Sequence, residues 1–253
     1  AGQVIALRIL LPVDEMLGRR DLERIGKDRC AAVRRGPEAH DLRSQGDRPI
    51  ISTFGLIGPG KGLEAAIRAL PAIAAQYPDI LYRVVGATHP NLVAAEGEAY
   101  RDSLVALAGE LGVSDNIAWE NRFLDLPELL EQIELCDIYL APYPNLGQIT
   151  SGTLAYAVAL GRAVVATPFV HARELLADDV GILLPTADSD AIAEAILLLL
   201  AHPGERQALQ ARAYARGRRT AWPEIARACA TLVEEVAAVP GRREPRRMFP
   251  SFA

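Results

Sequence analysis

A glycine-rich turn with one lysine is the part of the sequence best suited to chemistry. The run from Ile51 to Gly62 begins with β-branched and apolar residues and continues with four glycines and Lys61, and a helical pattern follows at once. This order is typical of a strand, a tight turn and a helix N-terminus, where free backbone N–H groups attract a phosphate. Gly55, Gly60 and Lys61 are therefore predicted to contact a diphosphate, with Lys61 as a point charge. The alternative is a glycine turn beside a solvated lysine.

The same turn matches only the first part of a nucleotide-binding motif. The residues from Gly55 to Lys61 satisfy G-x-x-x-x-G-K, the start of a Walker A loop. That loop then needs Ser or Thr to hold Mg²⁺, and Gly62 stands at this position. No apolar strand downstream ends in the acidic pair that such a site also needs. The sequence disfavours a P-loop NTPase, and we expect neither a metal ion nor a cofactor.

A second polar cluster precedes the helix that is predicted to start at Thr153. Gln148, Thr150, Ser151 and Gly152 stand directly before it, so hydroxyls and free N–H groups gather at a helix N-terminus and favour an anion. Glycine there lets a ligand approach the backbone closely. Simple N-capping by Ser151 or Thr150 is the alternative. Two such helix starts favour a shared diphosphate, provided that the fold brings them together.

Alternating strands and helices are the elements that must position these loops. The pattern predicts an α/β fold with a doubly wound parallel sheet and C-terminal helices. The strands are expected at 50–57, 80–86, 116–120, 137–142, 163–167 and 181–185. The helices are expected at 63–74, 91–111, 126–135, 153–160, 171–177, 189–200, 204–218 and 222–239.

Ligands of such sheets bind beyond the carboxyl ends of the strands. The loops at this edge hold nearly all the unusual polar residues and glycines of the chain, which favours one binding cleft there. They are the segments 55–61, 86–91, 121–123, 142–152 and 167–171.

The bulk composition excludes several classes of protein. The chain has 253 residues, is 50% hydrophobic and carries a net charge of -5, which disfavours a general nucleic-acid binder. Cys30, Cys136 and Cys229 fit no zinc or disulfide spacing and are typical of reduced thiols. No apolar run approaches the roughly 18 residues of a membrane span, and no signal peptide is evident. We therefore expect a cytoplasmic protein without a transmembrane segment.

Several motifs together resemble a known enzyme family. Pro-Gly-Lys-Gly after a strand, Val-Val-Gly86, Leu-Gly-Val-Ser-Asp-Asn-Ile, Cys-Asp-Ile-Tyr-Leu-Ala-Pro-Tyr and Ala-Leu-Gly-Arg-Ala-Val-Val-Ala-Thr-Pro are similar to the C-terminal donor domain of family 4 (group 1) retaining glycosyltransferases. The resemblance runs from about Pro49 to Val239. It implies a Rossmann-like sheet, one half of a GT-B fold, and transfer of a hexose from a nucleoside-diphosphate sugar to an acceptor that the sequence does not identify.

The resemblance also implies roles for individual residues. Lys61 corresponds to the lysine that contacts the diphosphate, and Gly55 with the stretch 151–153 corresponds to backbone that holds phosphates and sugar. Arg122 and Phe123 fall in the segment beside the nucleobase. Gln148 and Tyr156 occupy the two positions at which the family has glutamates, which bind the donor sugar and the ribose. We expect Lys61 and Gln148 to act on the reacting bond.

The chain departs from the family at these sites. A family arginine near the start of the first loop is replaced by Leu56 or its neighbour. Gln148 is still able to hydrogen-bond a sugar hydroxyl, whereas Tyr156 does not mimic a carboxylate that grips a ribose diol. No side-chain nucleophile is evident, so stabilisation of the departing diphosphate is the main task expected of the site.

The predicted domain organisation has three parts. Residues 1–48 form an irregular extension or the remnant of an acceptor domain, residues 49–240 a donor-binding domain, and residues 241–253 a basic tail. A complete GT-B enzyme needs an acceptor domain of similar size. We therefore expect truncation, a partner, or binding without transfer, the last being a non-catalytic nucleotide-sugar-binding module. An unpaired cleft wall favours a homo-oligomer.

Other residues give weaker signals. His89 follows a strand, so it either faces the cleft as a donor contact or caps the next helix. Arg122 is expected to pair with phosphate or with Asp125. The pair His171 and Glu174 shares one helix turn, and capping is favoured over metal binding.

Structural roles are favoured for the remaining candidates. Asp137 is expected to be structural because it begins a strand. The aromatic pairs Trp119/Phe123 and Tyr139/Tyr143 are expected in the core.

Overall fold

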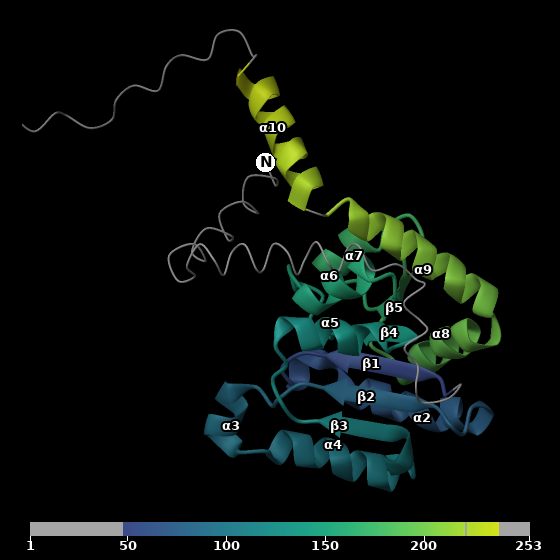
Figure 1. The fold of residues 1–253 in the computed structure, drawn as a ribbon. Coiled ribbons are helices and arrows are strands. Elements are labelled where there is room, and N and C mark those ends of the chain that lie inside the picture. The colour runs from purple at the N-terminus through teal and green to yellow at the C-terminus, as the bar shows by residue number, and fades with distance from the viewer. Residues whose placement is uncertain (1–47, 221, 238–253) are drawn as a thin grey trace, which may run out of the picture.

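The computed structural model describes residues 48–220 and 222–237 (Figure 1). Nearly all of the predicted N-terminal extension and the basic tail lie outside these residues. Cys30 lies outside them as well.

Six parallel strands form one sheet, which confirms the predicted fold class. Their order is β3-β2-β1-β4-β5-β6, so the direction in which strands are added reverses between β1 and β4. This reversal is the switch point at which doubly wound sheets bind ligands. The strands are β1 (Ile50–Phe54), β2 (Leu81–Val85), β3 (Ile117–Glu120), β4 (Ile138–Ala141), β5 (Ala163–Ala166) and β6 (Ile182–Leu183).

Helices cover both faces of the sheet (Figure 1). The central strands are apolar almost throughout because alternate residues enter two separate cores, as when Ile51 packs on one face and Phe54 on the other. The first core receives α2, α4 and α8, the second receives α5, α6 and α7, and α9 contributes to both. The helical elements are η2 (Pro59–Lys61), α2 (Leu63–Gln76), α3 (Pro90–Glu96), α4 (Ala99–Glu110), η3 (Ser114–Asn116), α5 (Leu126–Glu134), α6 (Gly152–Ala159), α7 (Val170–Leu175), α8 (Ser189–Ala201), α9 (Pro203–Arg218) and α10 (Trp222–Ala237).

The single helix predicted over residues 91–111 is wrong. Two helices, α3 and α4, occupy this stretch and meet at Gly97, whose positive φ of 66° ends the first helix. Behind the break, Arg101 is 6% exposed and donates to the main-chain oxygen of Gly86 at 2.8 Å. Glu98 accepts a hydrogen bond from the Thr88 hydroxyl. These bonds attach the turn after β2 to the start of α4.

The first strand is shorter than the predicted run from residue 50 to residue 57. It ends at Phe54 because Gly55 takes a φ of +116°, a conformation that side chains rarely adopt. Ile57 instead forms an isolated parallel bridge with Thr88. The glycine-rich turn is therefore tied to the turn that follows β2.

The C-terminal helix α10 projects away from the sheet (Figure 1). Its side chains from Pro223 onward are exposed, including a stripe of apolar ones. None of the helices in the described residues combines the length and the apolarity that crossing a membrane requires.

Candidate donor-binding edge

The two predicted phosphate loops meet at the switch point of the sheet. The loop after β1 spans residues 55–62, and the loop after β4 spans residues 142–151. They are in contact at Gly62, where an added Cβ would lie only 2.0 Å from the main-chain oxygen of Pro142. Gly62 also has a φ of 64° at the N-cap of α2, so both its conformation and its space exclude a side chain.

Lys61 lies between these loops. Its Nζ is 3.1 Å from the Tyr143 hydroxyl and 4.4 Å from the centroid of that ring. On the other side, a Cβ built on Gly55 would lie 3.1 Å from Nζ. The half-buried ammonium is therefore held at the switch point by a hydrogen bond and a cation–π contact.

Tyr143 is buried, and its surroundings lower the pKa of its hydroxyl below the ordinary value for tyrosine. Burial opposes loss of the proton, but the Lys61 ammonium and hydrogen bonding with Ser151 and Lys61 lower the pKa of the Tyr143 hydroxyl. The ring stacks on Phe169 with centroids 4.9 Å apart. Its main-chain oxygen accepts from the Thr167 hydroxyl at 2.6 Å. Strand β5 and its following turn thus position the aromatic partner of Lys61.

The second loop ends in a helix that Ser151 caps, which is the capping alternative of the sequence analysis. Ser151 is only 6% exposed, and its Oγ accepts from the Leu154 N–H at 3.4 Å. The neighbouring Thr153 hydroxyl lies 2.8 Å from that of Tyr139, a buried residue. Burial raises the pKa of Tyr139, so this phenol stays protonated. Gly152 is exposed with no atom within 4 Å of a built Cβ, which leaves room for a ligand at the start of α6.

Gln148 and Tyr156 do not join the Lys61 cluster by any described contact. The Gln148 side chain donates to the main-chain oxygen of Thr150 at 3.0 Å, within its own loop. Tyr156 is half-buried on α6 and packs against the second core. Gly60, the remaining predicted residue of the first loop, is exposed with open space around a built Cβ.

His89 lies at the same edge of the sheet and acts as a helix cap. Its Nδ1 accepts from the Asn91 N–H at 3.2 Å, which is the capping alternative of the sequence analysis.

Arg122 pairs with the carboxylates of Glu120 and Glu128, and not with Asp125, so of its two alternatives the pairing with Asp125 is wrong. Asp125 instead caps α5 by accepting from the Glu128 N–H at 3.0 Å. The hydrogen bonds that Arg122 donates to Glu128 lower the pKa of Glu128, and those that Glu128 and Glu120 accept raise the pKa of Arg122.

The aromatic residues divide between core and surface. Tyr139 and Tyr143 are buried, as predicted, and Trp119 packs partly buried against the first core. Phe123 is 80% exposed, so the prediction that it belongs to the core is wrong. Three residues beyond the end of β3, it lies on the carboxyl edge of the sheet. It offers a free aromatic face there.

Two functional candidates were underestimated or missed from sequence. Tyr143 was predicted only as a core residue. It follows the end of β4 at the carboxyl edge of the sheet, and this position in the sequence could have indicated a contact with Lys61. The other, His171, has its Nδ1 2.9 Å from the Ser151 main-chain nitrogen, from which it accepts a hydrogen bond. Burial lowers the pKa of His171, and Glu174 partly opposes this shift. Among the described residues, no group of three or more His, Cys, Asp or Glu is arranged to hold a metal ion.

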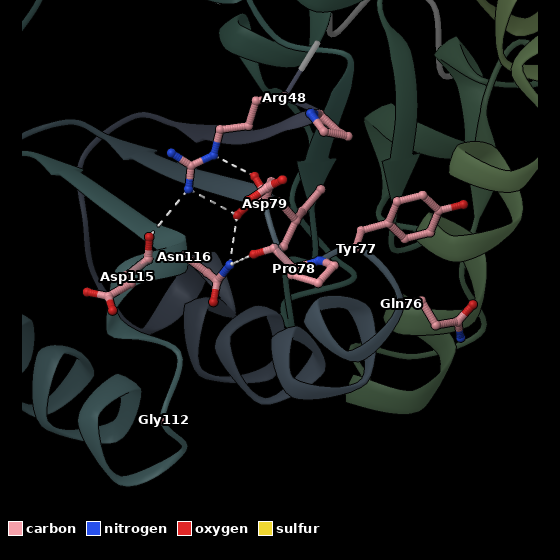
Figure 2. Close-up of a pocket in the computed structure, with 10 residues that line it drawn as sticks. Arg48, Gln76, Tyr77, Pro78, Asp79, Gly112, Asp115 and Asn116 are labelled. Carbon is pink, nitrogen blue, oxygen red and sulfur yellow. Dashed lines mark hydrogen bonds between the residues drawn. The ribbon is translucent and has the colours of Figure 1, made fainter. Parts of the chain in front are cut away.

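A separate hollow of about 940 Å³ lies on the opposite edge of the sheet (Figure 2). Its lining includes the residues that precede β1, β2 and β3. Here Arg48 donates to the main-chain oxygens of Ile80 and Asp115, and Asn116 donates to those of Pro78 and Ile80 (Figure 2). These side chains hydrogen-bond to main-chain oxygens of the same chain. We therefore interpret the hollow as a structural junction between the starts of three strands.

The family of the chain follows from comparison with known proteins. The model of the family described as Glycosyl transferases group 1 matches residues 37–216, and the chain belongs to this family. A phosphatidyl-myo-inositol mannosyltransferase of Mycolicibacterium smegmatis is 28% identical over 241 residues, covering 89% of this chain and 57% of that protein.

A second relative has a different acceptor in its name. A GDP-mannose-dependent alpha-(1-6)-phosphatidylinositol monomannoside mannosyltransferase of the same organism is 30% identical over 170 residues, covering 65% of this chain and 42% of that protein. The chain thus spans about half the length of these relatives.

Solved structures share the fold. Sucrose-phosphate synthase of Thermosynechococcus elongatus superposes with a TM-score of 0.64 at 22% identity, over 80% of this chain and 48% of that one. The C-terminal domain of the group 1 glycosyl transferase LpcC of Francisella tularensis gives a TM-score of 0.62 at 22% identity, over 74% of this chain and 93% of that one. The doubly wound sheet described here is the Rossmann-like half of a GT-B fold.

Proposed function

We propose that this chain is the donor-binding half of a retaining glycosyltransferase that moves a hexose from a nucleoside-diphosphate sugar to an acceptor. The observation that carries the proposal is the Lys61 ammonium, held between two glycine-containing loops at the switch point of the sheet. The open N-terminus of α6 lies on the second of these loops. A cation and a helix N-terminus are the groups that a diphosphate prefers.

The proposed chemistry is stabilisation of the leaving group. As the bond between sugar and diphosphate breaks, negative charge grows on the phosphate oxygens. Lys61 then offers a full charge, and the first free N–H groups of α6 offer a partial one. Gln148 contributes by donating to a sugar hydroxyl once its amide leaves the Thr150 oxygen. Family membership supports this assignment of roles.

The printed names of the relatives suggest which donor to test first. A relative at 30% identity is GDP-mannose-dependent, so GDP-mannose is our proposed donor. Phosphatidylinositol, which appears in the names of both relatives, is the acceptor class that we propose to test beside it. Phe123 and the neighbouring Arg122 are the proposed contacts for the base.

Calorimetric titration with GDP-mannose, UDP-glucose and ADP-glucose tests donor binding directly. The full chain is then incubated with each bound donor and phosphatidylinositol, and release of the nucleoside diphosphate and glycosylated lipid are followed. We expect saturable binding of one donor. Absence of binding to all of them would overturn the proposal.

A non-catalytic nucleotide-sugar-binding module is the second candidate. Two observations favour it: the Gln148 amide is engaged within its own loop, and Tyr156 packs against the core instead of presenting an acid to the ligand. Tight donor binding without hydrolysis or transfer would select this candidate over the enzyme.

A further inference from the structure

The loop that precedes α6 is attached to the start of α7 by a series of hydrogen bonds. The Val170 N–H donates to the Leu146 oxygen at 3.1 Å, and the His171 N–H donates to the Gln148 oxygen at 3.4 Å. In the opposite direction, the Ser151 N–H donates to the imidazole Nδ1 of His171 at 2.9 Å. The last bond is the shortest of these, and it is the only one made by a side chain.

The hydrogen bond between Ser151 and His171 lies at the N-terminus of α6. Ser151 is the N-cap of α6, so its position sets the direction of the first free N–H groups of that helix. Its Oγ is also within the hydrogen-bonding environment of Tyr143, the partner of Lys61. A change at His171 therefore reaches both halves of the proposed diphosphate site through a single residue.

We propose that His171 is a positioning residue: by accepting the Ser151 N–H, its uncharged imidazole holds the N-terminus of α6 in the orientation that binds the donor diphosphate. This inference rests on the proposed function for the identity of the ligand. The positioning itself is a property of the chain alone.

The charge state of His171 decides whether the bond exists. An imidazole that accepts at Nδ1 carries its proton on Nε2, and a second proton at Nδ1 would turn the acceptor into a donor that faces another donor. Acid therefore breaks the bond.

The charged neighbours are few. The segment 143–161, which includes the loop and α6, contains no Asp, Glu, Lys or Arg. Helix α7 itself brings Arg173 and Glu174, and α9 brings Arg216, which binds the Glu174 main-chain oxygen at the far end of α7. Lys61 lies on the other side, next to Tyr143.

Two substitutions at His171 separate positioning from simple packing. In His171→Asn, the side-chain oxygen occupies a place close to Nδ1 and accepts a hydrogen bond at every pH. In His171→Phe, the ring remains and the acceptor is lost. The matched control is His202→Asn, because His202 lies at the junction of α8 and α9, which the topology places away from this edge.

GDP-mannose and UDP-glucose are titrated calorimetrically into each full-length variant in steps from about pH 7.5 to about pH 4.5, because burial lowers the pKa of His171 below its ordinary value. Nucleotide sugars are used because their diphosphate lacks the terminal proton that titrates near pH 6. We expect His171→Phe to bind the donor about 5-fold more weakly at the higher pH, the effect of one lost hydrogen bond. The wild type and His202→Asn should lose affinity at the lower pH, whereas His171→Asn should retain it.

Amide hydrogen exchange at Ser151 provides a readout that needs no ligand. Exchange should be faster in His171→Phe than in the wild type and unchanged in His171→Asn. Should the wild type bind none of GDP-mannose, UDP-glucose and ADP-glucose, the proposed function fails, and the exchange rates alone decide the positioning role. Equal Ser151 exchange in all variants, or equal pH dependence of donor affinity in the wild type and His171→Asn, would overturn the inference.

Discussion

The Lys61 ammonium lies 3.1 Å from the Tyr143 hydroxyl and 4.4 Å from the centroid of the same ring. Tyr143 thus restrains a flexible side chain in two ways while leaving part of its donor capacity for a ligand. The contact joins the loop after β1 to the loop after β4, which are 82 residues apart in the chain.

Removing the charge of Lys61 is expected to weaken donor binding more than removing the Tyr143 hydroxyl does. Lys61→Met retains the apolar stem and deletes the ammonium, so the charge-assisted bond to the diphosphate is lost, worth about 1.5–3 kcal/mol or roughly 10- to 100-fold in affinity. Calorimetry with GDP-mannose, the proposed donor, measures this. Urea unfolding provides the control for folding, and donor affinity within 2-fold of the wild type would remove the role of Lys61.

Tyr143→Phe tests the restraint separately from the charge. The ring, its stacking on Phe169 and the cation–π contact remain, and only the hydroxyl is deleted. We expect donor affinity to fall by about 3- to 10-fold, because Lys61 keeps its charge and loses only one of its two restraints. In Lys61→Met the hydroxyl has no ammonium to restrain, so the double variant should bind as Lys61→Met does. Additive losses in this double-mutant cycle would contradict the restraint.

Gly62→Ala should unfold the junction between the two loops. A left-handed alanine costs about 1–2 kcal/mol, and the added methyl would also collide with the Pro142 oxygen at 2.0 Å. Gly112→Ala is the matched control, because Gly112 has a similar φ of 69° with nothing within 4 Å of a built Cβ. By urea unfolding, the loss for Gly62→Ala should exceed that for Gly112→Ala by at least about 2 kcal/mol. Equal losses would show that the contact with Pro142 relaxes easily.

Folding stability should depend on the charge of His171. Burial lowers its pKa in the folded protein below 6.5, so the unfolded chain takes up a proton that the folded chain refuses. The stability that the neutral imidazole contributes is fully present above pH 6.5 and is lost as the pH falls through the folded pKa. Unfolding free energies measured from neutral to acidic pH should therefore decline more steeply in the wild type than in His171→Asn. Parallel pH profiles would contradict the shift.

The two described cysteines should differ in reactivity. Burial raises the pKa of the Cys136 thiol to about 12, whereas Cys229 is exposed on α10. Iodoacetamide at neutral pH, followed by peptide mapping, should modify Cys229 in the native protein and Cys136 only in denaturant. Native-state labelling of Cys136 at the rate of Cys229 would show that the second core opens readily.

Much of the fold could be predicted because its causes are local. Apolar runs of strand length alternate with helical periodicity, and this pattern suffices for six parallel strands and for the edge at which the loops gather. The helix break at Gly97 was missed because the apolar pattern continues through it. The break depends on Arg101, whose partners Gly86 and Thr88 come from the turn after the preceding strand.

The candidate site was predictable only in part, for a similar reason. Glycines and hydroxyls before helices are visible in sequence, so Lys61 and Ser151 could be predicted as candidate site residues. The contacts of Lys61 with Tyr143 and of Ser151 with His171 join segments that are 82 and 20 residues apart, and no local pattern encodes them. Likewise, the exposure of Phe123 depends on where the chain turns after β3, which hydrophobicity alone does not indicate.

The contact between Lys61 and Tyr143 also joins the two helix layers. Lys61 directly precedes α2, whose apolar face fills the first core, and Tyr143 is a member of the second core. Along the strands the sheet separates these cores, so this pair forms a cross-link around its edge. A ligand whose phosphates reach both Lys61 and the start of α6 adds a second link between the layers. Occupancy of the edge is therefore coupled to the connection between the layers, and an anion too short to reach the second loop would leave that connection as it is in the free chain.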